Sequence, residues 1–273
     1  MLLIIIGFIL SAGATAASYF GFHLNELSLW YLFLLIPFFI TYFILYLNIY
    51  WGIVLIGIAK YRDKEFVGHV NLYHLFNVRL VSSFVLAING VVIKCKGIKN
   101  RPKEPGLYLF NHASDYDSWA LYKTMKGRYA FVGKKALRNI VMVRSLASSI
   151  GTLYVENGNN EQNYAMVDNA VEYITKKDTS VVIAPEGTRN FTGKILPFKH
   201  GGFNIAKRCK CPIYLVGIKG MEKTMDKKYK GLKKVQIELF GVIQPNEYEG
   251  FSAGQIAELC EGKYHQYFGD IDE

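Results

Sequence analysis

A histidine followed by two carboxylates stands at residues 111–119, which read Asn-His-Ala-Ser-Asp-Tyr-Asp-Ser-Trp. His112 can act as a general base, and a carboxylate that hydrogen-bonds its ring holds it in one tautomer, as acyl transfer requires. Asp117 and Asp115 both have the right chemistry for that role. Positions five apart on a regular helix are displaced by about 140°, so His112 and Asp117 can meet only across a tight turn. Asp115 is the rival orienting residue, or it caps the helix that follows.

A second interpretation assigns the same stretch no chemistry. Asn111, Ser114 and Asp115 can each satisfy backbone groups in a turn between a strand and a helix. His112 would then be incidental. The apolar run 106–110 predicts a buried strand, and a site at its C-terminal end would receive His112.

A second informative stretch, Pro-Glu-Gly-Thr-Arg at 185–189, follows another apolar run. Gly187 permits a close backbone approach, and Thr188 offers a hydroxyl. Arg189 offers a planar fork of N–H donors that suits phosphate. The alternative is a structural turn in which Glu186 pairs with Arg189.

Two lysines occupy an unusual place for helix stability. Lys134 and Lys135 follow the strand-like run 129–132 and open a predicted helix at 134–138. Cations at the start of a helix oppose its dipole, so anion binding at that helix terminus would account for them. The alternative is a pair of solvated lysines.

Strand-like and helix-like segments alternate along the chain from residue 66. The predicted strands are 91–96, 106–110, 129–132, 150–156, 179–184, 212–218 and 235–240. The predicted helices are 66–86, 119–125, 134–138, 161–177, 203–208 and 253–267. This order predicts an α/β fold with a mainly parallel sheet flanked by helices and with sites at the C-terminal ends of the strands. The helix over 66–86 is amphipathic, and it either lies along a membrane or covers the domain.

The first 59 residues contain no lysine or arginine. Apolar stretches at 2–22 and 29–59 are each long enough to cross a bilayer of roughly 30 Å, and they predict a helical hairpin in the membrane. We therefore expect a membrane anchor at 1–65 and a catalytic domain at 66–273. A signal peptide is the alternative for the first stretch, although it lacks a charged n-region. A re-entrant or monotopic hairpin is the alternative to spanning.

Charge predicts orientation and partners. Lys60, Arg62 and Lys64 follow the second apolar stretch, and the positive-inside rule then places the domain on the cytoplasmic face of the cell membrane. The chain has a net charge of +10, and all its lysines and arginines lie after that stretch, which favours anionic headgroups and phosphorylated substrates. The membrane hairpin and the lack of any nucleic-acid-binding module argue against nucleic acid as a partner. The four cysteines lack the usual zinc spacing, so we expect no metal.

The two main stretches together resemble the lysophosphatidic acid acyltransferase family, the bacterial 1-acylglycerol-3-phosphate acyltransferases. His112 and Asp117 match the histidine-four-residues-aspartate motif of that family, preceded by the expected Asn111. Residues 186–189 match its Glu-Gly-Thr-Arg motif without change. The resemblance extends over residues 106–217, with the motifs in the family's order.

Looser matches support the resemblance. Lys135 lies in a segment similar to the family's lysine-bearing segment, and Lys199 lies in a Pro-Phe-Lys-His-Gly turn like the family's Pro-Phe-Lys-x-Gly. One departure concerns a strand that usually ends in Phe-Ile-Asp-Arg in the family. Here Asn157 stands in the place of that arginine, which is thought to help hold the phosphate of the acceptor.

The resemblance implies that the chain moves a fatty acyl group from acyl carrier protein or coenzyme A to the sn-2 hydroxyl of 1-acylglycerol-3-phosphate, forming phosphatidic acid. In that reaction His112 would be the general base and Asp117 its orienting carboxylate. The residues expected to bind substrate are Glu186, Gly187, Thr188, Arg189, Lys135 and Lys199. We expect no bound cofactor, since the thioester is a substrate, and we expect membrane lipids and lysophosphatidic acid as partners.

Two alternatives to this activity remain open. The acceptor could be a lyso-ornithine lipid, glycerol-3-phosphate or another lysophospholipid, which Asn157 makes worth testing. The chain could also be a membrane protein that binds anionic lipid without catalysis. A panel of acceptors distinguishes the first alternative, and loss of function in a His112→Ala variant would exclude the second.

Overall fold

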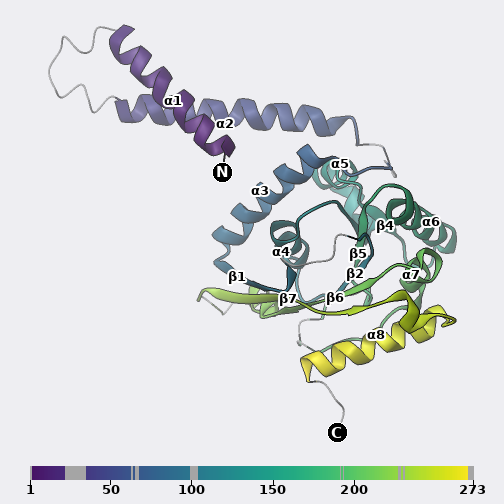
Figure 1. Cartoon of the computed structure of the whole chain (residues 1–273). Helices are drawn as coiled ribbons and strands as arrows, with labels where there is room; N and C mark the ends of the chain where they lie inside the picture. Colours follow the sequence, from purple (N-terminus) through teal and green to yellow (C-terminus); the bar gives the residue numbers. More distant parts are fainter. Residues whose placement is uncertain are drawn as a thin grey trace. The chain divides into compact units, whose positions relative to one another are not determined.

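The computed structural model describes residues 2–21, 35–62, 64, 68–98, 104–190, 192, 194–226, 229 and 231–269. The chain separates into two compact units, Met1–Lys60 and Tyr61–Glu273, which are described in turn (Figure 1). The predicted polar turn between the two apolar stretches, around residues 23–26, lies outside the described residues, as do residues 99–103 of the basic loop.

The first unit is a hairpin of two apolar helices, α1 (Leu2–Gly21) and α2 (Leu35–Ala59). The helices pack through Phe8 and Phe39, whose ring centroids lie 4.8 Å apart. Within the described residues, α2 is the one helix long and apolar enough to span a membrane, and α1 contributes the shorter apolar segment Ile5–Gly21. The predicted hairpin is confirmed, and α2 indicates membrane association.

The second unit is built on a seven-stranded sheet in the order β1-β7-β6-β2-β5-β3-β4. The strands are β1 (Val91–Lys96), β2 (Leu107–Phe110), β3 (Tyr129–Lys134), β4 (Leu153–Val155), β5 (Ser180–Ile183), β6 (Ile213–Lys219) and β7 (Lys233–Ile243). Neighbouring strands are parallel except β6 and β7, which are antiparallel. The predicted α/β fold with a mainly parallel sheet is therefore confirmed.

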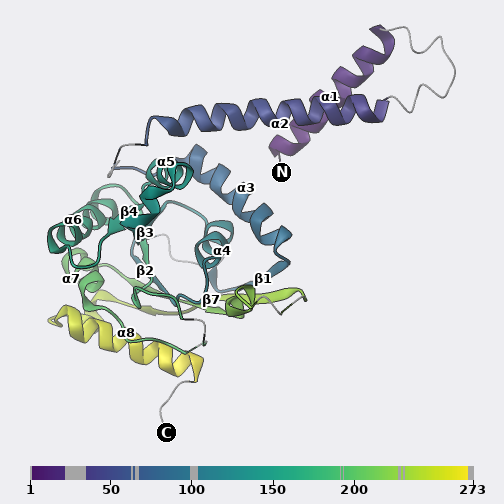
Figure 2. The ribbon, with the colours of Figure 1, turned by 180° about the vertical axis from the view of Figure 1, so that it is seen from behind.

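Helices cover both faces of this sheet (Figure 1 and Figure 2). They are α3 (Leu72–Ile88), α4 (Asp117–Thr124), α5 (Val141–Ser149), α6 (Asn160–Lys176), α7 (Asn204–Cys209) and α8 (Ala253–Phe268). Side chains of β2 alternate between the two faces. Leu107 and Leu109 join a core with α6, α7 and α8, whereas Tyr108 and Phe110 join a core with α4 and the end of α3.

Two predicted helices differ from the structure. The helix predicted at 66–86 begins only at Leu72, because Gly68 has a φ of +71° that a helix does not accommodate. The helix predicted at 134–138 is a 3-10 helix, Lys135–Asn139, and Lys134 belongs to β3. Helix α5 was not predicted.

Candidate active site

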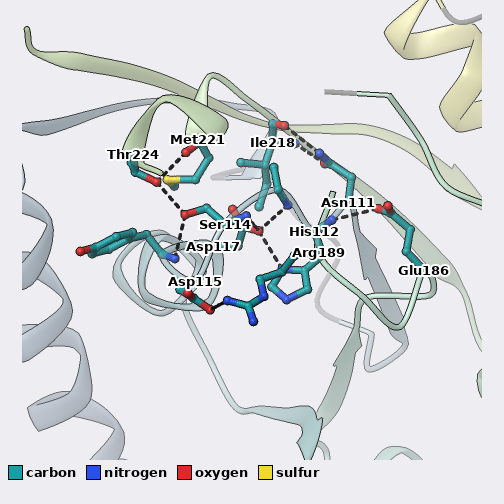
Figure 3. A network of polar contacts seen from close by, with 12 residues as sticks. Asn111, His112, Ser114, Asp115, Asp117, Glu186, Arg189, Ile218, Met221 and Thr224 are labelled. Atoms are coloured by element: carbon teal, nitrogen blue, oxygen red, sulfur yellow. Dashed lines mark hydrogen bonds and ion pairs between the residues drawn. The ribbon is translucent and has the colours of Figure 1, made fainter. Parts of the chain in front are cut away.

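The two motif stretches leave the sheet side by side. Strands β2 and β5 are adjacent and parallel, with Leu107 opposite Val181 and Leu109 opposite Ile183. Parallel neighbours end at the same edge of a sheet. The loop that carries His112 after β2 and the loop 184–190 after β5 therefore lie together (Figure 3).

Asp117 orients the His112 ring across the expected tight turn. The Nδ1 atom of His112 lies 2.9 Å from Oδ2 of Asp117, and the backbone N–H groups of Ala113 and Ser114 donate to the same oxygen at 2.8 Å (Figure 3). Asp117 is the first residue of α4 and is fully buried. An acceptor at Nδ1 places the ring proton there, which leaves Nε2 able to take a proton. The arrangement is that of a general base with its orienting carboxylate.

Burial and hydrogen bonding act on the Asp117 carboxyl in opposite directions. Burial raises the pKa of Asp117 above its ordinary value, while the hydrogen bonds from His112, Ser114 and Ala113 lower it. The Oδ1 atom of Asp117 has no hydrogen-bond partner among the described residues. The N–H donors on Oδ2 are thus what favours the ionised carboxylate in this buried place.

Asp115 does not orient His112. Its Oδ1 atom accepts a hydrogen bond from Nη1 of Arg189 at 2.5 Å, which joins the two loops at the surface (Figure 3). Glu186 does not pair with Arg189, so the alternative of a structural Glu186–Arg189 turn does not hold either.

Glu186 instead supports the backbone at His112. The Glu186 carboxyl is only 3% exposed. Its Oε1 atom accepts the backbone N–H of His112 at 2.9 Å, and its Oε2 atom accepts the backbone N–H of Leu196 at 3.3 Å. Burial raises the pKa of Glu186 to about 7. Through these contacts Glu186 fixes the backbone at His112, and a direct contact of Glu186 with substrate stays a prediction.

The raised pKa of Glu186 predicts a pH-dependent stability. Because the pKa in the folded chain, about 7, exceeds the ordinary value of 4.5, folding favours the protonated carboxyl. Its contribution to stability is complete below about pH 4.5 and is lost as the pH rises through 7. The loss amounts to up to about 3 kcal/mol, at 1.36 kcal/mol per pKa unit.

Glu186→Gln supplies the comparison because its side chain does not titrate. We expect the unfolding midpoint of the wild-type chain in detergent, relative to that of Glu186→Gln, to fall by several degrees between pH 5 and pH 8. A constant difference between the two midpoints across this range would contradict the pH dependence assigned to Glu186.

Gly187, Thr188 and Lys199 lie beside Arg189. Gly187 has a φ of +66°, and a Cβ atom at this position would lie 2.8 Å from Cδ, Cε and Nζ of Lys199, so the lysine side chain crosses directly over the glycine. Thr188 is exposed. Thr188 and Arg189 are thus both exposed next to Gly187, over which Lys199 crosses, and their binding of substrate stays a prediction.

Lys135 is not part of this group. It lies just after β3, which β5 separates from β2 in the sheet. Its Nζ atom pairs with Oε2 of Glu156 at 3.1 Å, and this contact holds the pKa of Glu156 below its ordinary value. The predicted helix terminus that would bind an anion with Lys135 is replaced by the 3-10 helix. Asn157 follows in an exposed turn after β4.

Asn111 and Ser114 bind the loop that carries His112 to the neighbouring strand β6 and the turn after it. The Asn111 side chain accepts the N–H of Ile218 at 2.7 Å and donates to the Ile218 carbonyl at 2.9 Å. The Oγ atom of Ser114 accepts the backbone N–H of Tyr116 and lies 2.6 Å from Oγ1 of Thr224. The interpretation that Asn111 and Ser114 satisfy backbone groups is therefore correct, and it coexists with the His112–Asp117 pair.

Thr224 was missed by the sequence analysis. Its hydroxyl also donates to the carbonyl of Met221 at 2.6 Å (Figure 3). It lies 110 residues after Ser114 in a lysine-rich connection, and no local pattern links the two.

Comparisons with known proteins find similar sequences among acyltransferases. Residues 92–219 match the sequence model of the acyltransferase family. The chain is 23% identical over 218 residues to the 1-acyl-sn-glycerol-3-phosphate acyltransferase of Saccharomyces cerevisiae, covering 79% of this chain and 69% of the yeast protein. It is 25% identical over 169 residues to the Escherichia coli protein of the same name, covering 61% of this chain and 68% of that protein.

A solved structure shares the fold. The 1-acyl-sn-glycerophosphate acyltransferase of Thermotoga maritima aligns with a TM-score of 0.61 and 22% sequence identity. The alignment covers 82% of this chain and 88% of that one.

Proposed function

We propose that the chain, whose residues 92–219 match the acyltransferase family model, transfers a fatty acyl group from an acyl thioester to the sn-2 hydroxyl of 1-acylglycerol-3-phosphate, giving phosphatidic acid. The observation that carries this proposal is the His112 ring, 2.9 Å from a buried carboxylate, with Nε2 free of hydrogen bonds to any described residue.

The proposed chemistry is a direct attack. Nε2 of His112 takes the proton of the acceptor hydroxyl while the hydroxyl oxygen forms a bond to the carbonyl carbon of the thioester. The C–S bond then breaks, and the imidazolium returns the proton to the thiolate. Asp117 stabilises the imidazolium between these two steps. The donor is acyl carrier protein or coenzyme A, and the reaction needs no bound metal or cofactor.

The acceptor phosphate is proposed to bind Arg189, with Lys199 beside it, which positions the hydroxyl for attack. We expect Arg189→Ala to raise the KM for 1-acylglycerol-3-phosphate about tenfold, because a half-exposed arginine contributes about 1.4 kcal/mol to phosphate binding. The KM for monoacylglycerol, which lacks phosphate, should not change. Equal losses with both acceptors in steady-state assays would show that Arg189 does not recognise phosphate.

A less anionic acceptor is the second candidate, and the charges of the site favour testing it. Asn157 replaces the arginine expected after β4, Lys135 pairs with Glu156, and Arg189 pairs with Asp115. Two of the three candidate cations are thus already paired with carboxylates. Comparing kcat/KM for lyso-ornithine lipid, glycerol-3-phosphate and other lysophospholipids with that for lysophosphatidic acid decides between them.

The Asp115 carboxylate is expected to weaken phosphate binding at Arg189. The pair is about half exposed, so holding Arg189 in place contributes at most about 1 kcal/mol. A phosphate bound to the same guanidinium would carry up to two negative charges. The repulsion between Asp115 and each of these charges costs up to about 1 kcal/mol in water. Repulsion therefore outweighs positioning for a dianionic acceptor.

We accordingly expect Asp115→Asn to lower the KM for lysophosphatidic acid about two- to fivefold with little change in kcat. Raising the salt concentration should reduce the difference. An increase in KM would mean that Asp115 serves chiefly to position Arg189.

The proposed location is the cell membrane, with the domain on its cytoplasmic face. Lys60, Arg62 and Lys64 follow α2 directly and are exposed, which supports this orientation through the positive-inside rule.

A further inference from the structure

The outward face of α3 carries exposed apolar side chains at both ends of the helix. The most exposed are Phe84 and Ile88, at 67% and 66%. Leu72, Tyr73 and Phe76 are 49%, 45% and 37% exposed. The opposite side of α3 packs on the domain through His74, Leu75, Asn77, Val78, Ser82 and Leu86.

No charged side chain interrupts this outward face. Arg79 is the one charged residue of α3, and its guanidinium donates to the carbonyls of Met125 and Gly127 at 3.0 Å. The arginine is therefore turned toward the end of α4. Several large exposed apolar side chains on one helix mark a candidate site of association with a protein or a membrane.

Two features of the chain favour a bilayer as the occupant. Lys60, Arg62 and Lys64 precede α3 in the sequence and are exposed. Residues 60–96 contain six lysines and arginines, of which Arg79 and Lys96 are bonded within the domain, and only two acidic residues, so the segment attracts anionic headgroups. Tyr73, Phe76 and Phe84 are aromatic residues of the type that lies at the membrane interface.

We propose that the outward face of α3 lies in the interfacial layer of an anionic bilayer and holds the domain against the membrane surface. The helix thus has two apolar sides, one in the core of the domain and one in lipid. This inference depends on α3 and its flanking residues alone and is independent of the acceptor that the site uses.

The test places a fluorescent probe on α3 in the full chain. Cys95 and Cys209, which are partly exposed, are first replaced by serine. A cysteine introduced by Phe84→Cys then carries an environment-sensitive nitrobenzoxadiazole label. The protein is reconstituted in vesicles of phosphatidylglycerol and phosphatidylcholine, with or without bromine on the acyl chains. Bromine quenches only a label that contacts the lipid.

The matched control is Glu258→Cys on α8, an exposed position on the opposite face of the sheet (Figure 2). We expect brominated lipid to reduce emission at position 84 at least twofold and to leave emission at position 258 within a tenth of its value. Equal quenching at the two positions would overturn the proposal. An apolar emission spectrum at position 84 without bromine quenching would also overturn it, because a partner protein or a second copy of the chain would then cover α3.

Discussion

Replacing His112 by alanine is expected to lower kcat for acyl transfer by about 10²–10⁴-fold with little change in the KM for either substrate. An alcohol is almost wholly protonated at neutral pH, and a positioned base typically contributes a rate factor of this size. The side chain is about a quarter exposed at the surface of the site, so its removal should leave the fold intact. Steady-state kinetics with a radiolabelled thioester measures the loss.

The matched control is His265→Ala. His265 lies on α8 and faces Glu261 at 3.6 Å, and among the described residues it forms no hydrogen bond or ion pair with His112 or Asp117. The His265→Ala variant should keep the wild-type kcat. A His112→Ala variant that retains more than a tenth of the wild-type kcat would show that another group takes the proton.

The Asp117→Asn variant is expected to lower kcat by about 10²–10³-fold. Three N–H groups donate to Oδ2 of Asp117, so the amide oxygen of asparagine must occupy that position and the ring of His112 keeps its tautomer. The change therefore removes the charge while it keeps the turn. A carboxylate about 4 Å from the imidazolium contributes up to about 4 kcal/mol at an effective dielectric constant of 20.

The amide nitrogen of Asp117→Asn would lie where Oδ1 has no partner among the described residues, so we also expect a lower unfolding midpoint. Measuring kcat and the midpoint together separates the two effects. If kcat falls less than fivefold in a folded variant, the charge of Asp117 does not stabilise the imidazolium.

Residue type and spacing predict that His112 pairs with one of two nearby carboxylates, and the family resemblance favours Asp117. The requirement for a tight turn follows from the helical period alone. Residue type and spacing alone could not decide between Asp117 and Asp115. That choice depends on Arg189, which binds Asp115 from a loop 74 residues away in the sequence. Glu186 illustrates the same limit. Glu186 accepts a hydrogen bond from the backbone N–H of His112. The residue types of the motif do not reveal which backbone N–H will donate to a buried carboxyl.

The strands could be predicted where a short apolar run is bounded by polar or turn-forming residues. Strands β2 and β5 carry fully buried side chains on both faces, which is typical of the centre of a parallel sheet. Where the predicted helix boundaries differ from the structure, local backbone geometry is the reason. Gly68 delays the start of α3 through its positive φ, and Lys134 stays extended as the last residue of β3. The antiparallel pairing of β7 with β6 depends on long-range contacts that no local pattern reports.

The central claim, that this chain acylates the sn-2 hydroxyl of lysophosphatidic acid with His112 as base, is tested most directly by identifying the product. Purified chain in vesicles is given an isotopically labelled acyl thioester of acyl carrier protein or coenzyme A together with 1-acylglycerol-3-phosphate. Mass spectrometry then reads the position of the label. We expect phosphatidic acid labelled at sn-2 from the wild-type chain and none above background from His112→Ala. Transfer of the label only to other acceptors, or equal product from both proteins, would contradict the account.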